Sequence, residues 1–161
     1  MKKITIFCSI VAMGFLIACG GGENNSSENN GGGDAAKTTP STSDYDPHRG
    51  EGKWDKDNVK VGETLDTKMA AEGKKIYDVK CASCHKLTDE RLVGPGWKGV
   101  TSRVTAPWIM NFITNPDPMI VKDPELQAQL EICLVRMPNQ NLTDDDARNI
   151  LEFMRENDGV K

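Results

Sequence analysis

The sequence lacks three features that mark common classes of protein. Its 161 residues contain no uninterrupted apolar run of the roughly 20 residues that a membrane-spanning helix needs. Five cysteines are too few, and are wrongly spaced, for a disulfide scaffold. The formal net charge is -4, whereas a nucleic-acid partner requires a basic face. We therefore expect no spanning helix, no disulfide framework and no nucleic acid partner.

The first nineteen residues have the pattern of an export signal. Lys2 and Lys3 precede a mostly apolar run over 4–17, and a small residue then precedes Cys19. Such a charged start, short apolar stretch and small-residue cleavage site are typical of a secretory signal. The segment Leu16–Cys19 resembles the lipobox of bacterial lipoproteins, which implies that Cys19 carries the lipid that anchors the protein to a membrane. The alternative is an ordinary secretory signal with a chance cysteine.

The rest of the chain divides by composition. Removal of a signal peptide over 1–18 leaves a segment, 19–44, rich in Gly, Asn, Ser and Thr, which predicts a lipidated, flexible and disordered linker. Residues 45–64 contain scattered apolar side chains and predict an extended arm. Residues 65–161 form the predicted domain. Export would place this domain on the periplasmic side of a membrane or at the cell surface.

The periodicity of the domain predicts an all-α fold of about four helices. Apolar or small residues recur at three- and four-residue spacing from about Leu65 up to Cys81. A second helix is expected from Pro107 to Asn115, followed by a proline-rich loop, and a third over 124–134. The fourth follows the N-cap Thr143, stops at Gly159 and buries one apolar face. The residues predicted on that face are Ala147, Ile150, Leu151 and Met154. No segment predicts a strand.

The sequence Cys81-Ala82-Ser83-Cys84-His85 is the signature of covalent c-type haem attachment. On a helical turn, residues at i, i+3 and i+4 share a face. Two thiols can then bond the haem edge while His85 meets the iron. A zinc site would need about four ligands, and no second Cys pair or Cys-His cluster is present. A thioredoxin-like pair would need a βαβ unit, which the sequence does not predict.

The domain resembles class I cytochromes c over about 66–157. The attachment motif, the Gly-Pro turn over 94–99, the methionine-containing loop over 137–142 and the final helix follow in that family's order. The resemblance implies helices around one covalent haem c with His/Met ligation of the iron. It also implies electron transfer as the function.

Met137 is the predicted sixth ligand of the haem iron. It precedes the capped final helix, where the family keeps its ligand, whereas Met110 and Met154 lie in helical patterns typical of core methionine. Met119, in the proline-rich segment, and His48, the only other histidine, remain alternatives.

The resemblance also implies roles around the haem. The carbonyl of Pro95 matches the family's acceptor for Nδ1–H of the ligating histidine. Arg103 matches an arginine near a haem propionate, and the indole of Trp108 is a second candidate donor there. A solvated arginine and a core tryptophan are the alternatives. Trp97 is expected to pack on the haem edge.

Cys133 has no predicted disulfide partner. We expect it to behave as a small buried apolar residue, and an intermolecular disulfide is the alternative.

Together these patterns predict a membrane-tethered, monohaem electron carrier rather than an enzyme. Expected partners are a quinol-oxidising complex and an exported terminal oxidase or reductase, for example a nitrous-oxide reductase. A haem peroxidase and a gas-binding or sensing haem module are the alternatives.

Overall fold

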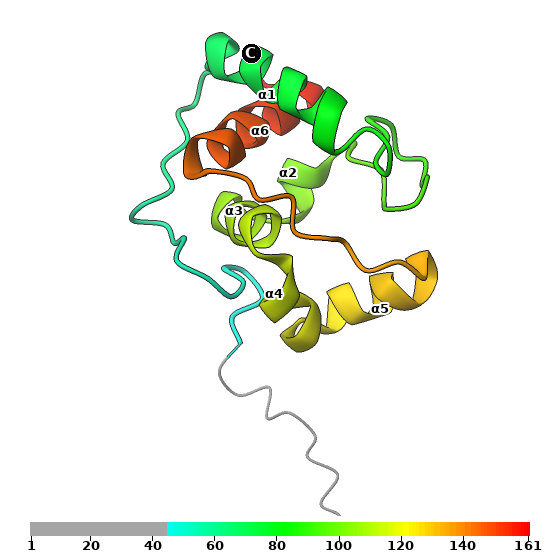
Figure 1. Cartoon of the computed structure of the whole chain (residues 1–161). Coiled ribbons are helices and arrows are strands. Elements are labelled where there is room, and N and C mark those ends of the chain that lie inside the picture. The colour runs from blue at the N-terminus through cyan, green and yellow to red at the C-terminus, as the bar shows by residue number, and fades with distance from the viewer. Residues whose placement is uncertain (1–44) are drawn as a thin grey trace, which may run out of the picture. The chain divides into compact units, whose positions relative to one another are not determined.

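Helices make up the regular structure of residues 45–161, the part of the chain that the computed structural model describes (Figure 1). The predicted signal peptide, Cys19 and the linker over 19–44 lie outside these residues. The helices are α1 (Thr67–Lys80), α2 (Val100–Arg103), α3 (Ala106–Thr114), α4 (Pro116–Lys122), α5 (Pro124–Cys133) and α6 (Asp144–Asn157). The only strand-like pairing in this part is an isolated bridge between His85 and Arg91. The all-α prediction is therefore confirmed. No helix within 45–161 has the length and apolar character to cross a membrane.

The first and last helices pack across each other, as Figure 1 shows. Asp66 caps α1 by accepting hydrogen bonds from the next turn. The crossing is close at Gly73, where a Cβ would lie 2.1 Å from the backbone oxygen of Asn149 on α6. Beyond this point Tyr77 packs on Phe153, with ring centroids 5.4 Å apart. Small and aromatic residues on one face of α1 thus set its contact with α6.

The buried face of α6 is the one that the sequence predicts. Ala147, Ile150, Leu151 and Met154 are all at most 3% exposed. Thr143 and Asp146 form a reciprocal capping box at the start of this helix. Gly159, with φ of +94°, follows its end.

The segment after α3 differs from the prediction. Thr105 caps α3, and α3 ends before Asn115 as expected. The proline-rich stretch is not a loop but α4, with Pro116 at its first position. A proline there loses no hydrogen bond, because the first N–H groups of a helix have no partner within it. The short helix α2 was also not predicted.

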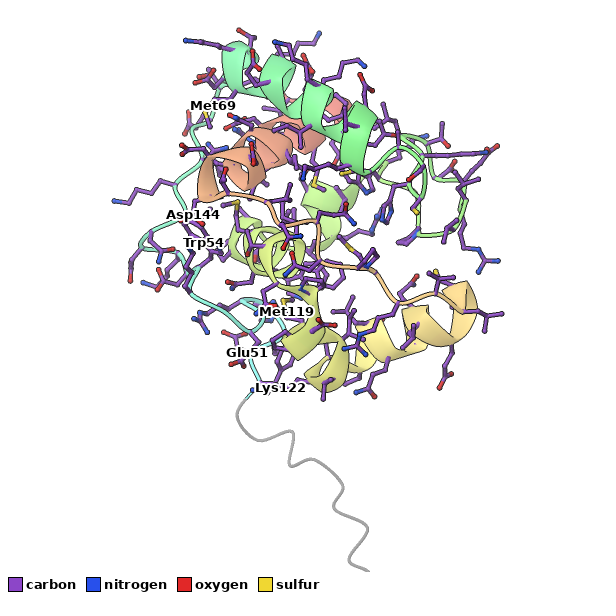
Figure 2. All side chains as sticks on the ribbon, in the orientation of Figure 1. Glu51, Trp54, Met69, Met119, Lys122 and Asp144 are labelled. Carbon is purple, nitrogen blue, oxygen red and sulfur yellow. The ribbon has the colours of Figure 1, made fainter. Side chains whose placement is uncertain are left out.

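Residues 45–64 form an arm without helix or strand. The arm is bound to α3 by Asn111, which is only 1% exposed. Its Nδ2 donates to the carbonyls of Arg49 and Trp54 at 3.0 and 2.9 Å, and its Oδ1 accepts from Trp54 N at 2.9 Å. Ion pairs between Glu51 and Lys122 and between Lys53 and Asp144 join the arm to α4 and α6. Figure 2 shows these contacts near Trp54 and the buried Met119.

Candidate haem-attachment site

The attachment motif leaves the end of α1 as a series of turns. The backbone N–H groups of Cys84 and His85 both donate to the carbonyl of Cys81, at 3.0 and 2.9 Å. The bond from His85 N–H to the carbonyl of Cys81 has the spacing of an α-helical hydrogen bond, although the segment is not part of α1. Both motif cysteines are free thiols. Cys81 is 8% exposed and Cys84 is partly exposed.

His85 has one ring nitrogen engaged by the Gly-Pro turn. Its Nδ1 lies 2.8 Å from the carbonyl oxygen of Pro95, the acceptor that the family resemblance implies. A carbonyl only accepts, so this bond places the proton on Nδ1 and leaves the Nε2 lone pair for a metal. The turn approaches closely, since a Cβ on Gly94 would lie 2.4 Å from His85 Cε1. The absent side chain of Gly94 therefore makes room for the imidazole.

Burial sets the protonation of the two groups that face the site. It lowers the pKa of His85 below its usual range, and the hydrogen bond to Pro95 opposes this only in part. Burial also raises the pKa of the Cys81 thiol to about 11, with Cys84 adding to the shift and Lys80 opposing it. His85 is thus a neutral imidazole and Cys81 a neutral thiol near neutral pH.

Two aromatic side chains support the histidine. The ring of Trp97 lies 5.7 Å from that of His85 and 4.9 Å from that of Tyr77. The hydroxyl of Tyr77 donates to the backbone oxygen of His85 at 2.7 Å. Tyr77 was not predicted from the sequence to have a role at this site. The signal was present, because a buried tyrosine needs a partner for its hydroxyl and the motif follows within one turn.

The methionine-containing segment between α5 and α6 is held near this region by one hydrogen bond within it and by another at the last turn of α5. Lys80 Nζ, at the end of α1, donates to the carbonyl of Gln140 at 2.9 Å. Arg91 Nη1, in the loop after His85, donates to the carbonyl of Ile132 at 3.0 Å. Met137 lies between these anchors and is half-buried. Figure 1 shows this segment crossing from α5 to α6.

The alternative ligands have other surroundings. Met119 is fully buried within α4, under the arm. His48 is exposed on the arm, where its carbonyl accepts a hydrogen bond from the hydroxyl of Thr105. Neither residue belongs to the segments that surround His85.

Arg103 closes the Gly-Pro turn. Its Nη1 donates to the carbonyl of Lys98 at 2.5 Å and its Nη2 to that of Gly96 at 3.3 Å. The guanidinium therefore holds together the loop that carries Pro95. A contact with a haem propionate stays a prediction.

Trp108 has a carboxylate partner that the sequence did not suggest. Its indole Nε1 donates to Asp123 Oδ2 at 3.2 Å, and the hydroxyl of Tyr45 donates to the same oxygen at 2.5 Å. Asp123 is 3% exposed and also caps α5. The indole N–H of Trp108 is therefore already bonded within the protein. A role for Trp108 at a haem propionate stays a prediction.

Cys133 is the last residue of α5. It is a free thiol and is half-buried, rather than fully buried as expected.

The residues around His85 fit a covalently bound haem. Two unpaired thiols stand three residues apart, and the neighbouring imidazole keeps Nε2 free while Gly94 leaves space beside the ring. Within 45–161 no three His, Cys, Asp or Glu residues gather as a metal site, so the zinc alternative gains no support. Cys81 and Cys84 would bond the haem edge, and His85 would ligate its iron.

Comparison with known proteins points the same way. The family model described as Cytochrome c matches residues 70–158. Among solved structures, a cytochrome c from Rhodothermus marinus is 34% identical with a TM-score of 0.60, over 63% of this chain and 86% of that chain. An engineered form of it, Rma TDE, is 33% identical with a TM-score of 0.59, over 63% and 87%. No curated protein matches the chain.

Proposed function

The chain belongs to the cytochrome c family, and we propose that it is a monohaem electron carrier with His85 and Met137 as the axial ligands of the iron. The observation that carries this proposal is the state of His85. Its Nδ1 is bonded to Pro95, which leaves Nε2 as the ring nitrogen that can ligate iron, and Cys81 and Cys84 of the same motif are free thiols. When bound, a haem supplies the change between ferric and ferrous iron.

The protein's own part is to hold and orient the ligands. Pro95 fixes the tautomer and the orientation of the His85 ring. Trp97 packs beside that ring at 5.7 Å, and Tyr77 packs on Trp97; both side chains are only 6% exposed. The anchored segment around Met137 supplies a soft thioether, which favours the ferrous state and raises the reduction potential.

The N-terminal sequence supports the proposed location, and the electron-carrier function supports the proposed partners. A lipid on Cys19 would anchor the protein to a membrane, facing the periplasm or the cell surface, and the linker would let the domain move between large complexes. The partners would be a quinol-oxidising complex as electron donor and an exported terminal oxidase or reductase as acceptor. A tethered carrier needs only small, transient interfaces with each of them.

Mass spectrometry of the exported protein tests the haem. The peptide that contains Cys81–His85 should carry the mass of one haem, and the Cys81→Ala/Cys84→Ala protein should carry none. A wild-type peptide without the adduct would remove the basis of the proposal.

Ligand binding separates a carrier from the alternative haem functions. With both axial positions occupied, the ferrous protein should not bind carbon monoxide without denaturation, and the ferric protein should not turn over peroxide. Rapid carbon monoxide binding would favour a gas-binding module, and peroxide turnover would favour a peroxidase.

A further inference from the structure

Leu134 occupies a position that suits leucine poorly in two ways. It ends α5 in the left-handed conformation, with φ of 59° and ψ of 5°, where glycine or asparagine is usual. Its side chain is also 84% exposed. Either property alone would favour a small or polar residue. An apolar side chain at such a position is therefore better explained by a contact outside the folded chain than by the fold.

Leu134 does not stand alone. Three further side chains, on its own segment or on the loop after His85, are at least half exposed, and we call the set the apolar ridge: Leu92, Ile132, Leu134 and Val135. The hydrogen bond from Arg91 to the carbonyl of Ile132 joins the two segments. The ten residues of α5, which carries Ile132 and ends before Leu134, include no buried side chain, so this helix adds little to the core.

The ridge belongs to the two segments that lead to the proposed iron ligands. Leu134 precedes Met137 by three residues, and the backbone of Leu92 bonds the carbonyl of Gly94, next to the ring of His85. A protein that covered the ridge would therefore stand beside the proposed redox centre.

The charges around the ridge nearly cancel, with one net negative charge when Asp117, the partner of Arg136, is counted. The segments 86–92 and 131–136 contain three cations and three anions, namely Lys86, Arg91 and Arg136 against Asp89, Glu90 and Glu131. Lys86 and Glu90 pair with each other at 2.7 Å, and Arg136 pairs with Asp117 at 2.8 Å. The surface thus offers neither a basic nor an acidic partner an attraction. Anionic lipid would likewise find no cluster of lysine and arginine.

We propose that the apolar ridge is the docking surface for an uncharged, apolar face of the redox partner protein, a proposal that rests on the proposed electron-carrier function. A carrier surface with little net charge and exposed aliphatic side chains favours a partner whose own surface is uncharged and apolar. With haem bound, its ferrous iron would be oxidised by one electron as the docked acceptor is reduced, and no bond would form between the two proteins. A small apolar contact suits the transient complex that repeated turnover requires.

Stopped-flow oxidation of the ferrous protein tests this surface. The soluble form would be the full chain with Cys19→Ser, and the probe a cupric blue-copper protein whose copper-ligating histidine lies in an uncharged apolar face. The second-order rate constant should change less than about twofold between low and high salt, because there is little charge to screen. Leu134→Asn should lower it about fivefold, because an aliphatic contact is lost, and Leu134→Met should retain it.

Controls separate docking from folding and from haem function. Leu134→Asn should melt at or above the wild-type temperature, since asparagine tolerates the left-handed conformation. Val61→Asn, on the arm, should keep the wild-type rate. Ferricyanide should oxidise wild type and Leu134→Asn equally, and failure of ferricyanide to oxidise the wild type would instead refute the proposed function.

Three results would overturn the docking proposal. One is that Leu134→Asn reduces the copper protein at the wild-type rate. Another is a concentration-dependent dimer that Leu134→Asn abolishes, which would assign the ridge to a second copy of the chain. The third is binding of the Cys19→Ser protein to phosphatidylcholine vesicles that Leu134→Asn abolishes, which would assign it to a bilayer.

Discussion

At the scale of single residues, the environment of His85 depends on backbone groups of its neighbours and on the absence of a side chain at Gly94. Pro95 contributes only a backbone oxygen, and Gly94 contributes only the absence of a Cβ. Tyr77 binds the backbone of His85 rather than its ring. The imidazole is therefore fixed in one orientation while its metal-binding nitrogen stays unobstructed.

Gly94→Ala tests the close approach of the turn. The new Cβ would lie 2.4 Å from His85 Cε1, so the ring or the turn must move. We expect the haem to remain attached and the free energy of unfolding of the haem-loaded protein to fall by about 2 kcal/mol, a typical cost of overpacking. Denaturant titration measures this.

Gly62→Ala is the matched control for that substitution. The nearest atom to a Cβ at Gly62 lies at 3.5 Å, an ordinary contact. Its unfolding free energy should stay within about 0.5 kcal/mol of wild type. Equal stability losses in the two variants would contradict the role given to Gly94.

At the scale of elements, the capping box of α6 fixes where the methionine-containing segment ends. Thr143 Oγ1 accepts from Asp146 N, and Asp146 Oδ2 accepts from Thr143 N, both at 3.1 Å. Thr143→Ala should cost about 1 kcal/mol of unfolding free energy, and Thr143→Ser should restore most of it. Thermal unfolding of the three proteins measures the difference. A serine variant as unstable as the alanine variant would indicate that packing of the threonine methyl, not the cap, is responsible.

The arm depends on one side chain of α3. Asn111→Ala removes two donors and one acceptor from buried backbone groups of Arg49 and Trp54. We expect a loss of about 3 kcal/mol and faster amide exchange over 49–59, because unsatisfied buried groups are costly. Asn115→Ala is the control, since that side chain makes no capping bond to α4. Unchanged exchange in Asn111→Ala would show that the arm is held by its other contacts.

The helices could be predicted from the sequence wherever periodicity and caps agreed. Thr143, Gly159 and the apolar face between them defined α6, and the pattern before Cys81 defined α1. The segment over 116–122 was misassigned because its prolines were taken as helix breakers, although they stand in the first turn, where proline is tolerated. The rule that proline breaks a helix thus failed because it does not apply to the first turn.

The candidate site divides in the same way. The contact of the Gly-Pro turn with His85 could be predicted, because the motif and the turn are written in the sequence, whereas Met137 as a ligand stays a prediction. The pairing of Trp108 and Tyr45 with Asp123 could not, since it joins residues 15 and 78 positions apart through the fold. The exposure of Leu134 could not be predicted either, because its four-residue spacing from Leu126 and Leu130 is typical of a buried helix face.

At the scale of the whole molecule, the proposed tether and the domain have separate tasks. The lipid on Cys19 would set where the protein resides, and the domain would set its redox chemistry. Cys19→Ser should therefore move the haem protein from the membrane fraction to the soluble fraction with an unchanged absorption spectrum. Fractionation of cells followed by haem staining measures this. Retention of the variant in the membrane fraction would contradict lipid anchoring at Cys19.

In the proposed carrier, His85 and Met137 hold the iron of a covalently attached haem. The near-infrared charge-transfer band of the ferric protein reports the methionine sulfur–iron bond. We predict that Met137→Ala abolishes this band and that Met119→Ala, which alters a fully buried residue of α4, retains it. Persistence of the band in Met137→Ala together with its loss in Met119→Ala would contradict the claim.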